Sequence, residues 1–198
     1  KIIYFVEKNV CNLQIKRMSQ RILKIYDYNI ILDYIYRLLI YYKKNLYILH
    51  LKTYEAHKFR KNLKGKKTQL YFTEHENESG LNYLKNFGLE KNAKWVCISN
   101  RDSRYLNIAQ SGGWPKREQS WNYHSYRNFS IQSLSGAAKV FVAQGYYVFR
   151  MGKYVNEKFN CQDSKIIDYA NSDISNDFLD VFLLANNEFY IGSDSGIM

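Results

Sequence analysis

The sequence predicts an α/β protein in which a parallel β-sheet with flanking helices follows a basic, mostly helical region. Three observations favour this fold class. Short apolar runs alternate with runs of helical periodicity in the second part of the chain, a pattern typical of parallel sheets. Of the 198 residues, 46% are hydrophobic, which is enough for a packed core. The excess of positive charge lies in the first part of the chain.

The first part is expected to be mainly helical. Apolar residues recur at helical spacing in two segments, Leu13–Tyr26 and Tyr28–Lys43, which predicts two helices. A short strand is expected at Asn45–Lys52, and a basic linker follows at Lys58–Gln69.

The second part repeats a strand and helix pattern. Glycine follows two of the expected helices, at Gly88 and Gly145, as a helix C-cap often requires. The expected helices are Glu78–Phe87, Ser130–Gln144 and Asn176–Asn186, and the expected strands are Lys94–Ser99, Tyr146–Arg150, Lys165–Asp168 and Glu188–Ile191. The alternation predicts that these strands pair in parallel and that helices cover both faces.

The distribution of charge supports a division into two domains, residues 1–71 and 72–198. Residues 1–75 contain 16 Lys and Arg against 5 Asp and Glu, whereas residues 76–198 contain 13 of each. The first part therefore carries the whole net charge of +11. Such a region attracts nucleic acid, an anionic membrane surface or an anionic lipid-linked substrate. A basic face that is merely solvated is the alternative.

Other sequence features exclude several classes of protein. Three widely separated cysteines, Cys11, Cys97 and Cys161, suggest neither a disulfide framework nor a zinc site. The most hydrophobic run, Tyr28–Tyr42, is too short and too charged to span a membrane. Because the chain begins with Lys1 and breaks off after an expected strand, we expect a fragment that lacks sequence at both ends.

The loop after the first expected strand of the sheet supplies the first candidate site residues. Ligands of parallel α/β sheets bind beyond the carboxyl ends of the strands. Arg101 and Asp102 directly follow the first expected strand of the sheet, and Arg150 ends the second. An arginine can bind two phosphate oxygens, and Asp102 can hold the guanidinium or the loop in place. A structural Arg–Asp pair is the alternative.

The segment GSDSG, Gly192 to Gly196, follows the last expected strand and is a second candidate. Gly192 and Gly196 permit close approach of the backbone to a ligand. The amides of a following helix, with the hydroxyls of Ser193 and Ser195, would suit a phosphate or diphosphate. An ordinary strand-to-helix loop, in which a serine or Asp194 caps the helix, is the alternative.

A long loop that contains both Gly112–Gly113 and Pro115 precedes a third candidate group. His124 is a candidate general base and Arg127 a candidate anion clamp. A loop that simply leads into the next helix is the alternative. Because zinc-protease, nucleophile-elbow and clustered Cys/His patterns do not occur in the sequence, metal-centred and serine-triad chemistry are disfavoured.

Five segments taken in order resemble a family of bacterial glycosyltransferases from surface-polysaccharide gene clusters. They are FTEHENESGLNYLKNFGL, WVCISNRDSRYLN, HSYRNFSIQSLSGAAKVFVAQGYYVFRMGK, IIDYANS and NDFLDVFLLANNEFYIGSDSGI. The resemblance covers residues 72–198. The strand that leads to Arg101 and Asp102 is also loosely similar to a motif of the fucosyltransferase superfamily, in which an arginine contacts the diphosphate of the sugar donor.

The resemblance implies a two-domain, Rossmann-like glycosyltransferase. Residues 72–198 would form an incomplete nucleotide-sugar-binding domain, and residues 1–71 would belong to the acceptor-side domain. Sugar would pass from a nucleotide diphosphate sugar to a hydroxyl of a glycan or lipid-linked acceptor in surface polysaccharide biosynthesis, including lipopolysaccharide or capsule. The expected location is the cytoplasm, including the inner face of the membrane.

The same resemblance assigns roles to residues of the site. Arg101, Arg127, Arg150 and the segment Gly192, Ser193, Asp194, Ser195 and Gly196 would bind the donor diphosphate. His124 or Asp102 would be the acceptor base, and neither a metal nor another cofactor is implied. Two alternatives stay open: a nucleic-acid-binding protein that uses the basic, Tyr-rich first part, and a non-catalytic scaffold with the same fold.

Overall fold

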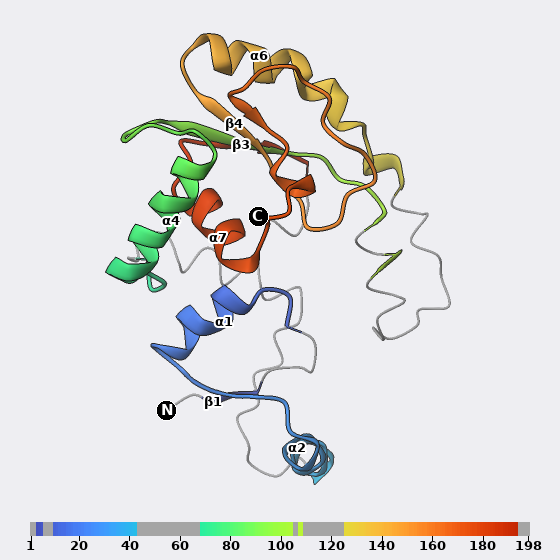
Figure 1. Cartoon of the computed structure of the whole chain (residues 1–198). Coiled ribbons are helices and arrows are strands. Elements are labelled where there is room, and N and C mark those ends of the chain that lie inside the picture. Colours follow the sequence, from blue (N-terminus) through green and yellow to red (C-terminus); the bar gives the residue numbers. More distant parts are fainter. Residues whose placement is uncertain (1–2, 6–9, 43–67, 105–106, 109–124, 194–198) are drawn as a thin grey trace. The chain divides into compact units, whose positions relative to one another are not determined.

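The computed structural model describes residues 3–5, 10–42, 68–104, 107–108 and 125–193 (Figure 1). The chain divides into two compact units, Lys1–Thr73 and Glu74–Met198, called unit 1 and unit 2 below. Within the described residues, no helix is both long enough and apolar enough to cross a membrane.

The described residues of unit 1 form two helices and a pair of parallel strands. Helix α1 (Leu13–Gln20) begins at Asn12, whose side chain accepts a hydrogen bond of 3.0 Å from the Ile15 amide. Helix α2 spans Ile30–Tyr42, and β1 (Ile3–Phe5) pairs with β2 (Lys24–Tyr26). The helix expected at Tyr28–Lys43 is therefore confirmed.

The expected helix over Leu13–Tyr26 is only partly correct. It ends at Gln20, and its last three residues form β2 instead. The reason is a distant partner, because the backbone of Lys24–Tyr26 pairs with Ile3–Phe5, and tertiary pairing can override a local helical pattern. The strand expected at Asn45–Lys52 and most of the expected linker at Lys58–Gln69 lie outside the described residues.

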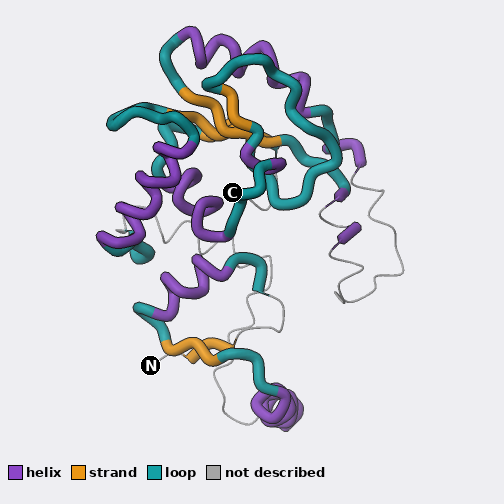
Figure 2. The backbone as a smooth tube through the Cα atoms, viewed as in Figure 1, coloured by secondary structure: helices purple, strands orange, loops and turns teal. Residues whose placement is uncertain are grey.

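Unit 2 is built on a four-stranded parallel sheet, which confirms the α/β class (Figure 2). Its strands are β3 (Trp95–Ser99), β4 (Tyr147–Arg150), β5 (Ile166–Ile167) and β6 (Tyr190–Gly192). Their order across the sheet is β5-β4-β3-β6, and all three pairings are parallel. The four expected strands are confirmed within two residues at each end.

The helices of unit 2 cover both faces of this sheet. Among the described residues, these helices are α4 (Glu74–Asn86), the 3-10 helix η2 (Ile131–Leu134) that leads into α6 (Ser135–Ala143), and α7 (Asp177–Ala185). A short 3-10 helix, η3 (Tyr169–Asn171), follows β5. The chain passes from β3 to β4 and then to β5 on one side of β3, and it then crosses back so that β6 lies on the other side of β3. Because such crossovers are right-handed, their helices must lie on opposite faces. Figure 1 shows α6 on one face and α4 with α7 on the other.

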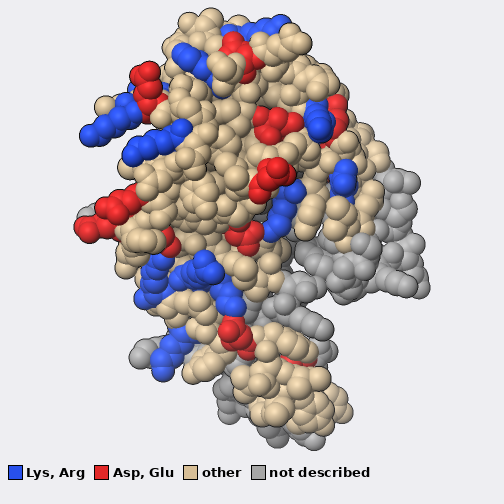
Figure 3. Space-filling view, in the orientation of Figure 1, with Lys and Arg blue, Asp and Glu red and all other residues tan. Residues whose placement is uncertain are grey.

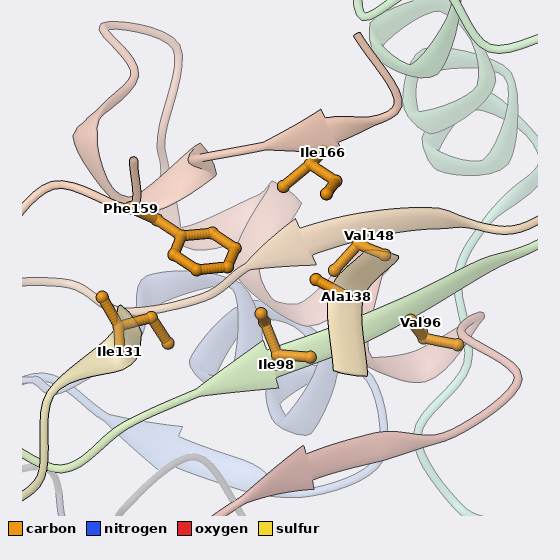
Figure 4. Packing of buried hydrophobic residues seen from close by; sticks show 7 residues of the cluster. All are labelled: Val96, Ile98, Ile131, Ala138, Val148, Phe159 and Ile166. Carbon is orange, nitrogen blue, oxygen red and sulfur yellow. The ribbon is translucent and has the colours of Figure 1, made fainter. Parts of the chain in front are cut away.

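Alternation along β3 divides the core between the two faces. Val96, Ile98 and Val148 pack with residues of η2 and α6 in one fully buried cluster (Figure 4). Trp95 and Cys97 point the other way, and the Trp95 indole donates a hydrogen bond of 3.0 Å to the Leu183 carbonyl of α7. Such a strand, buried on both faces, is characteristic of a parallel sheet.

Helices α4 and α7 approach each other closely at Gly80. A Cβ atom at Gly80 would lie 2.5 Å from one ring carbon of Phe182 and closer to two others. Phe182 itself is buried in α7. Helix α7 begins at Asn176, whose side-chain oxygen accepts hydrogen bonds from the amides of Phe178 and Leu179 at 3.1 and 3.0 Å.

Candidate functional site

The strand order places a reversal point between β3 and β6. Successive strands are added on one side of β3 up to β5, and the next strand, β6, lies on the other side of β3. In open α/β sheets, the ligand site lies beyond the carboxyl ends of the two strands that flank such a point. Those ends are Ser99 of β3 and Gly192 of β6, which are paired in register.

The loop after β3 is fixed against the segment that enters η2. The Asn100 side chain donates a hydrogen bond of 2.8 Å to the Phe129 carbonyl, and the Phe129 amide donates one of 3.3 Å to the Arg101 carbonyl. This places Arg101 directly beyond β3. Its Nη1 atom is buried and has no hydrogen-bond partner within the described parts of the chain. A buried guanidinium nitrogen without an acceptor suits an anionic ligand.

Asp102 holds two loops together through both of its carboxylate oxygens. Oδ1 accepts a hydrogen bond from the Arg104 amide, and Oδ2 accepts one from the Asn156 amide, each at 2.9 Å. The Arg104 side chain extends the same contact by donating a hydrogen bond of 3.0 Å to the Val155 carbonyl. The arrangement joins the loop after β3 to the connection between β4 and β5.

Arg150, at the end of β4, is fully buried within unit 2. Its Nη1 atom lies 3.4 Å from Oδ1 of Asp168, and its Nη2 atom donates a hydrogen bond of 3.3 Å to Oδ1 of Asn100. Burial lowers the pKa of the guanidinium, whereas the carboxylates of Asp168, Asp102 and Glu157 oppose that shift. The arginine therefore joins three strand-end loops beneath the edge of the sheet.

Asp168 forms an ion pair with Arg150 and accepts hydrogen bonds from two further donors. Its Oδ2 atom accepts hydrogen bonds from the Phe159 amide at 2.8 Å and from the Asn171 side chain at 2.7 Å. These hydrogen bonds satisfy the carboxylate of the buried ion pair. On the other side of the pair, Nε of Arg150 is buried and has no hydrogen-bond partner among the described residues.

A carboxylate of the chain itself occupies the N-terminus of the η2–α6 helix. Glu157 accepts hydrogen bonds from the Ile131 amide at 2.6 Å and from the Ser130 hydroxyl at 2.9 Å. The first helix after the first strand of a parallel sheet often offers such amides to a ligand phosphate. Here Glu157 fills that position, which leaves the edge between β3 and β6 as the better place for an anion.

The end of β6 is packed tightly against β3. The hydroxyls of Ser99 and Tyr190 are hydrogen-bonded to each other. A Cβ atom at Gly192 would lie 2.6 Å from Cζ of Tyr190 and 2.8 Å from Oγ of Ser99. Any larger residue at this position would have to displace the Tyr190 ring, which is a steric reason for glycine that the sequence did not indicate. Beyond it, Oγ of Ser193 is buried and has no hydrogen-bond partner among the residues described.

The structure places some of the expected site residues together and leaves others undescribed. Arg101, Asp102, Arg150, Gly192 and Ser193 all follow or end strands at the same edge of the sheet. Arg127 lies in a short 3-10 turn at Ser125–Arg127, and its guanidinium carbon is 5.8 Å from the centre of the Tyr126 ring. The remaining expected residues, His124, Asp194, Ser195 and Gly196, lie outside the described residues.

Sequence reasoning missed three residues that organise this edge. Asn100 precedes Arg101 in a strand-end loop, and Asp168 is the last residue of the third expected strand, so position alone could have indicated both. Glu157 carries no such signal, because it lies 26 residues from the amide that it caps. Within the described residues, no group of three or more His, Cys, Asp or Glu side chains is arranged to hold a metal ion.

Comparison of the chain with protein-family models, with curated proteins and with solved structures gives no match. The glycosyltransferase resemblance therefore stays a prediction from the motifs.

Proposed function

We propose that the chain is a glycosyltransferase whose unit 2 binds a nucleotide diphosphate sugar at the edge between β3 and β6. The supporting observation is a pair of buried donors, Nη1 of Arg101 and Oγ of Ser193, that lack hydrogen-bond partners in the described structure. They come from the loops after β3 and β6, the two strands that flank the reversal of strand order. Buried donors without a partner are costly unless a ligand satisfies them.

The proposed reaction transfers a sugar to a hydroxyl of a glycan or lipid-linked acceptor. The acceptor oxygen attacks the anomeric carbon, and the bond from that carbon to the terminal diphosphate oxygen breaks. The nucleoside diphosphate leaves with the bonding electron pair. Arg101, Arg127 and the Gly192–Gly196 turn stabilise its negative charge, because fixed donors are most effective where charge develops. Arg150 was expected to join them, but it is fully buried and paired with Asp168, so we propose that it holds the strand-end loops instead.

The hydroxyl proton passes to a base in an inverting reaction, for which we propose His124 or Asp102. The base must lie within hydrogen-bond reach of the acceptor hydroxyl. Asp102 lies at the correct edge of the sheet, but its oxygens also hold the amides of Arg104 and Asn156. Substitution of Asp102 therefore affects the loops as well as any proton transfer, and His124 is the cleaner position to test.

The proposal includes the setting of the reaction. We place the enzyme in the cytoplasm, where nucleotide sugars are made, and at the inner face of the membrane, where a lipid-linked acceptor would be presented. The basic character of residues 1–75 supports this placement, because an anionic acceptor is attracted to a region with such an excess of Lys and Arg.

A titration with nucleoside diphosphates tests the donor site. The full chain is mixed with each of a panel of nucleoside diphosphates, and thermal unfolding is followed. Ligand at 100 times its dissociation constant should stabilise the folded state by about 2.7 kcal/mol. We expect Arg101→Ala to weaken binding by about tenfold to a hundredfold, because a hydrogen bond to a charged group is lost.

Arg104→Ala is the matched control for this experiment. Arg104 lies three residues beyond Arg101, where that loop enters a helix, and it carries the same charge, but its side chain is exposed and donates to the Val155 carbonyl. The control should bind as the unmodified chain does. If no nucleoside diphosphate stabilises the protein, or if both variants lose affinity equally, a specific donor contact at Arg101 is refuted.

A further inference from the structure

One face of helix α2 in unit 1 is apolar and exposed. Its members have side chains with no charge, and between 39% and 73% of each residue's surface is accessible. They are Ile30, Ile31, Tyr34, Ile35 and Leu38, called the α2 face below. In Figure 3, the surface around α2 is mainly tan, whereas blue and red side chains are interspersed over the visible face of unit 2.

The spacing of these residues makes the α2 face continuous. At 100° per residue, the five positions fall within an arc of about 140°. A helix of a globular protein normally turns an apolar stripe of this width toward the core. Here the stripe points outward, whereas Asp33, on the other side of the helix, is half-buried. Such an outward apolar face marks a surface that binds something.

The length of α2 limits how it can meet a lipid bilayer. Its 13 residues span about 20 Å, less than the apolar thickness of a membrane. A helix of this kind lies in the plane of the interface, with its apolar face among the acyl chains. Tyr34 suits that position, because its ring is apolar and its hydroxyl can stay in water.

The net charge of residues 1–75, to which α2 belongs, decides between the candidate partners. Residues 1–75 carry the whole excess of +11, and Lys43 and Lys44 directly follow the helix in the sequence. A second copy of the chain would bring two regions of the same charge together, which opposes association. Residues 76–198 carry no net charge to complement it. An anionic lipid surface supplies both the opposite charge and an apolar phase.

We infer that the α2 face inserts into the interface of an anionic membrane and anchors the protein there. The inference concerns unit 1 and holds whether or not unit 2 transfers a sugar. Apolar insertion and attraction to lipid headgroups act together, so both apolar substitutions and salt should weaken the interaction.

Vesicle sedimentation with the full chain tests the inference. We compare vesicles of phosphatidylcholine with vesicles of equal parts phosphatidylcholine and phosphatidylserine. The unmodified chain should sediment with the anionic vesicles and be released by salt. The double variant Ile31→Ser and Ile35→Ser should bind at least about tenfold more weakly than the unmodified chain, because two partly inserted side chains lose their apolar contribution.

The matched control introduces the same chemistry in unit 2. Leu81 and Val140 are also exposed, at 54% and 55%, so Leu81→Ser with Val140→Ser removes a similar apolar surface. This control variant should leave vesicle binding unchanged.

Ile30→Ser, at the most exposed position of the α2 face, is a single substitution that should also weaken vesicle binding. Circular dichroism checks that each variant is folded.

Three outcomes would overturn the inference. The first is equal binding to both kinds of vesicle. The second is salt-sensitive binding that the α2 variants leave unchanged, which would mean that the basic segments adsorb without insertion. The third is a dimer in light scattering that the Ile31 and Ile35 substitutions dissociate, which would make the α2 face a contact between copies.

Discussion

Replacing Gly80 with alanine should destabilise unit 2, although alanine is the better helix former. Gly80 lies within α4 and is buried against Phe182 of α7. An added Cβ atom would lie 2.5 Å from one ring carbon and closer to two others. Ordinary contacts between carbon atoms are about 3.5–4.0 Å, so the helix or the ring must move by about 1 Å. The ring cannot simply turn into solvent, because Phe182 is only 3% exposed.

Gly136 is a built-in comparison for this effect. It also lies in a helix, α6, but it is exposed, and a Cβ atom added there meets nothing within 4 Å. Alanine should gain up to about 1 kcal/mol over glycine at either position. At Gly80, overpacking of the core costs about 1–3 kcal/mol as well. We therefore expect Gly136→Ala to stabilise the protein and Gly80→Ala to be the less stable of the two by about 1–3 kcal/mol.

Urea unfolding followed by tryptophan fluorescence measures this difference. All three tryptophans, Trp95, Trp114 and Trp121, belong to unit 2, so the signal reports that unit. A double-mutant cycle with Phe182→Leu then isolates the contact, because a smaller side chain gives the new methyl group room. The double variant should be more stable, by about 1 kcal/mol or more, than the sum of the two single effects predicts.

The reasoning is refuted if Gly80→Ala stabilises unit 2 as much as Gly136→Ala does. It is also refuted if Gly80→Ala has the same effect with Phe182 and with leucine at that position. Either result would mean that α4 and α7 do not pack at the distance that the structure gives.

Two further predictions concern ionisable groups in unit 2. Burial raises the pKa of the Cys97 thiol. A thiol reagent should therefore modify the exposed Cys11 rapidly and Cys97 only after unfolding. Peptide mass analysis measures both modification rates in the folded protein, and equal rates would contradict the prediction. Burial also raises the pKa of Asp180, although the hydrogen bond from Tyr169 opposes the shift. A raised carboxyl pKa stabilises the folded state below the unfolded pKa, and this contribution is lost as pH rises through the folded pKa. Asp180→Asn should therefore gain stability relative to the unmodified chain as pH rises through this range; urea midpoints at several pH values measure it, and a gain that grows toward acid would contradict it.

Most of the local structure of unit 2 could be predicted from the sequence. Apolar runs of three or four residues identified β3, β4 and β6. The runs of β3 and β4 are nearly continuous because strands covered on both faces need apolar side chains on both. Gly88 and Gly145, both with positive φ, marked the ends of two helices as expected. These patterns involve only residues that are neighbours in the sequence, so they can be recognised before the tertiary structure is known.

Local patterns were insufficient where distant segments compete for the backbone. Lys24–Tyr26 continues the helical spacing of α1, yet it forms β2 because Ile3–Phe5 supplies its hydrogen bonds. The same limit applies to Gly192, which was expected to approach a ligand. Its immediate neighbour in the structure is the Tyr190 ring, and only the register of β6 against β3 reveals that packing.

The sequence by itself determined the α/β class, the division of charge between the two parts, and the polar residues that follow each strand. The tertiary structure decided the strand order β5-β4-β3-β6 and therefore which two of those strand ends flank the reversal point. It also decided that Arg150 pairs with Asp168 and Asn100, and that Glu157 caps the η2–α6 helix. These contacts join residues 18 to 50 positions apart, and such pairings depend on how whole elements pack, which no local spacing encodes.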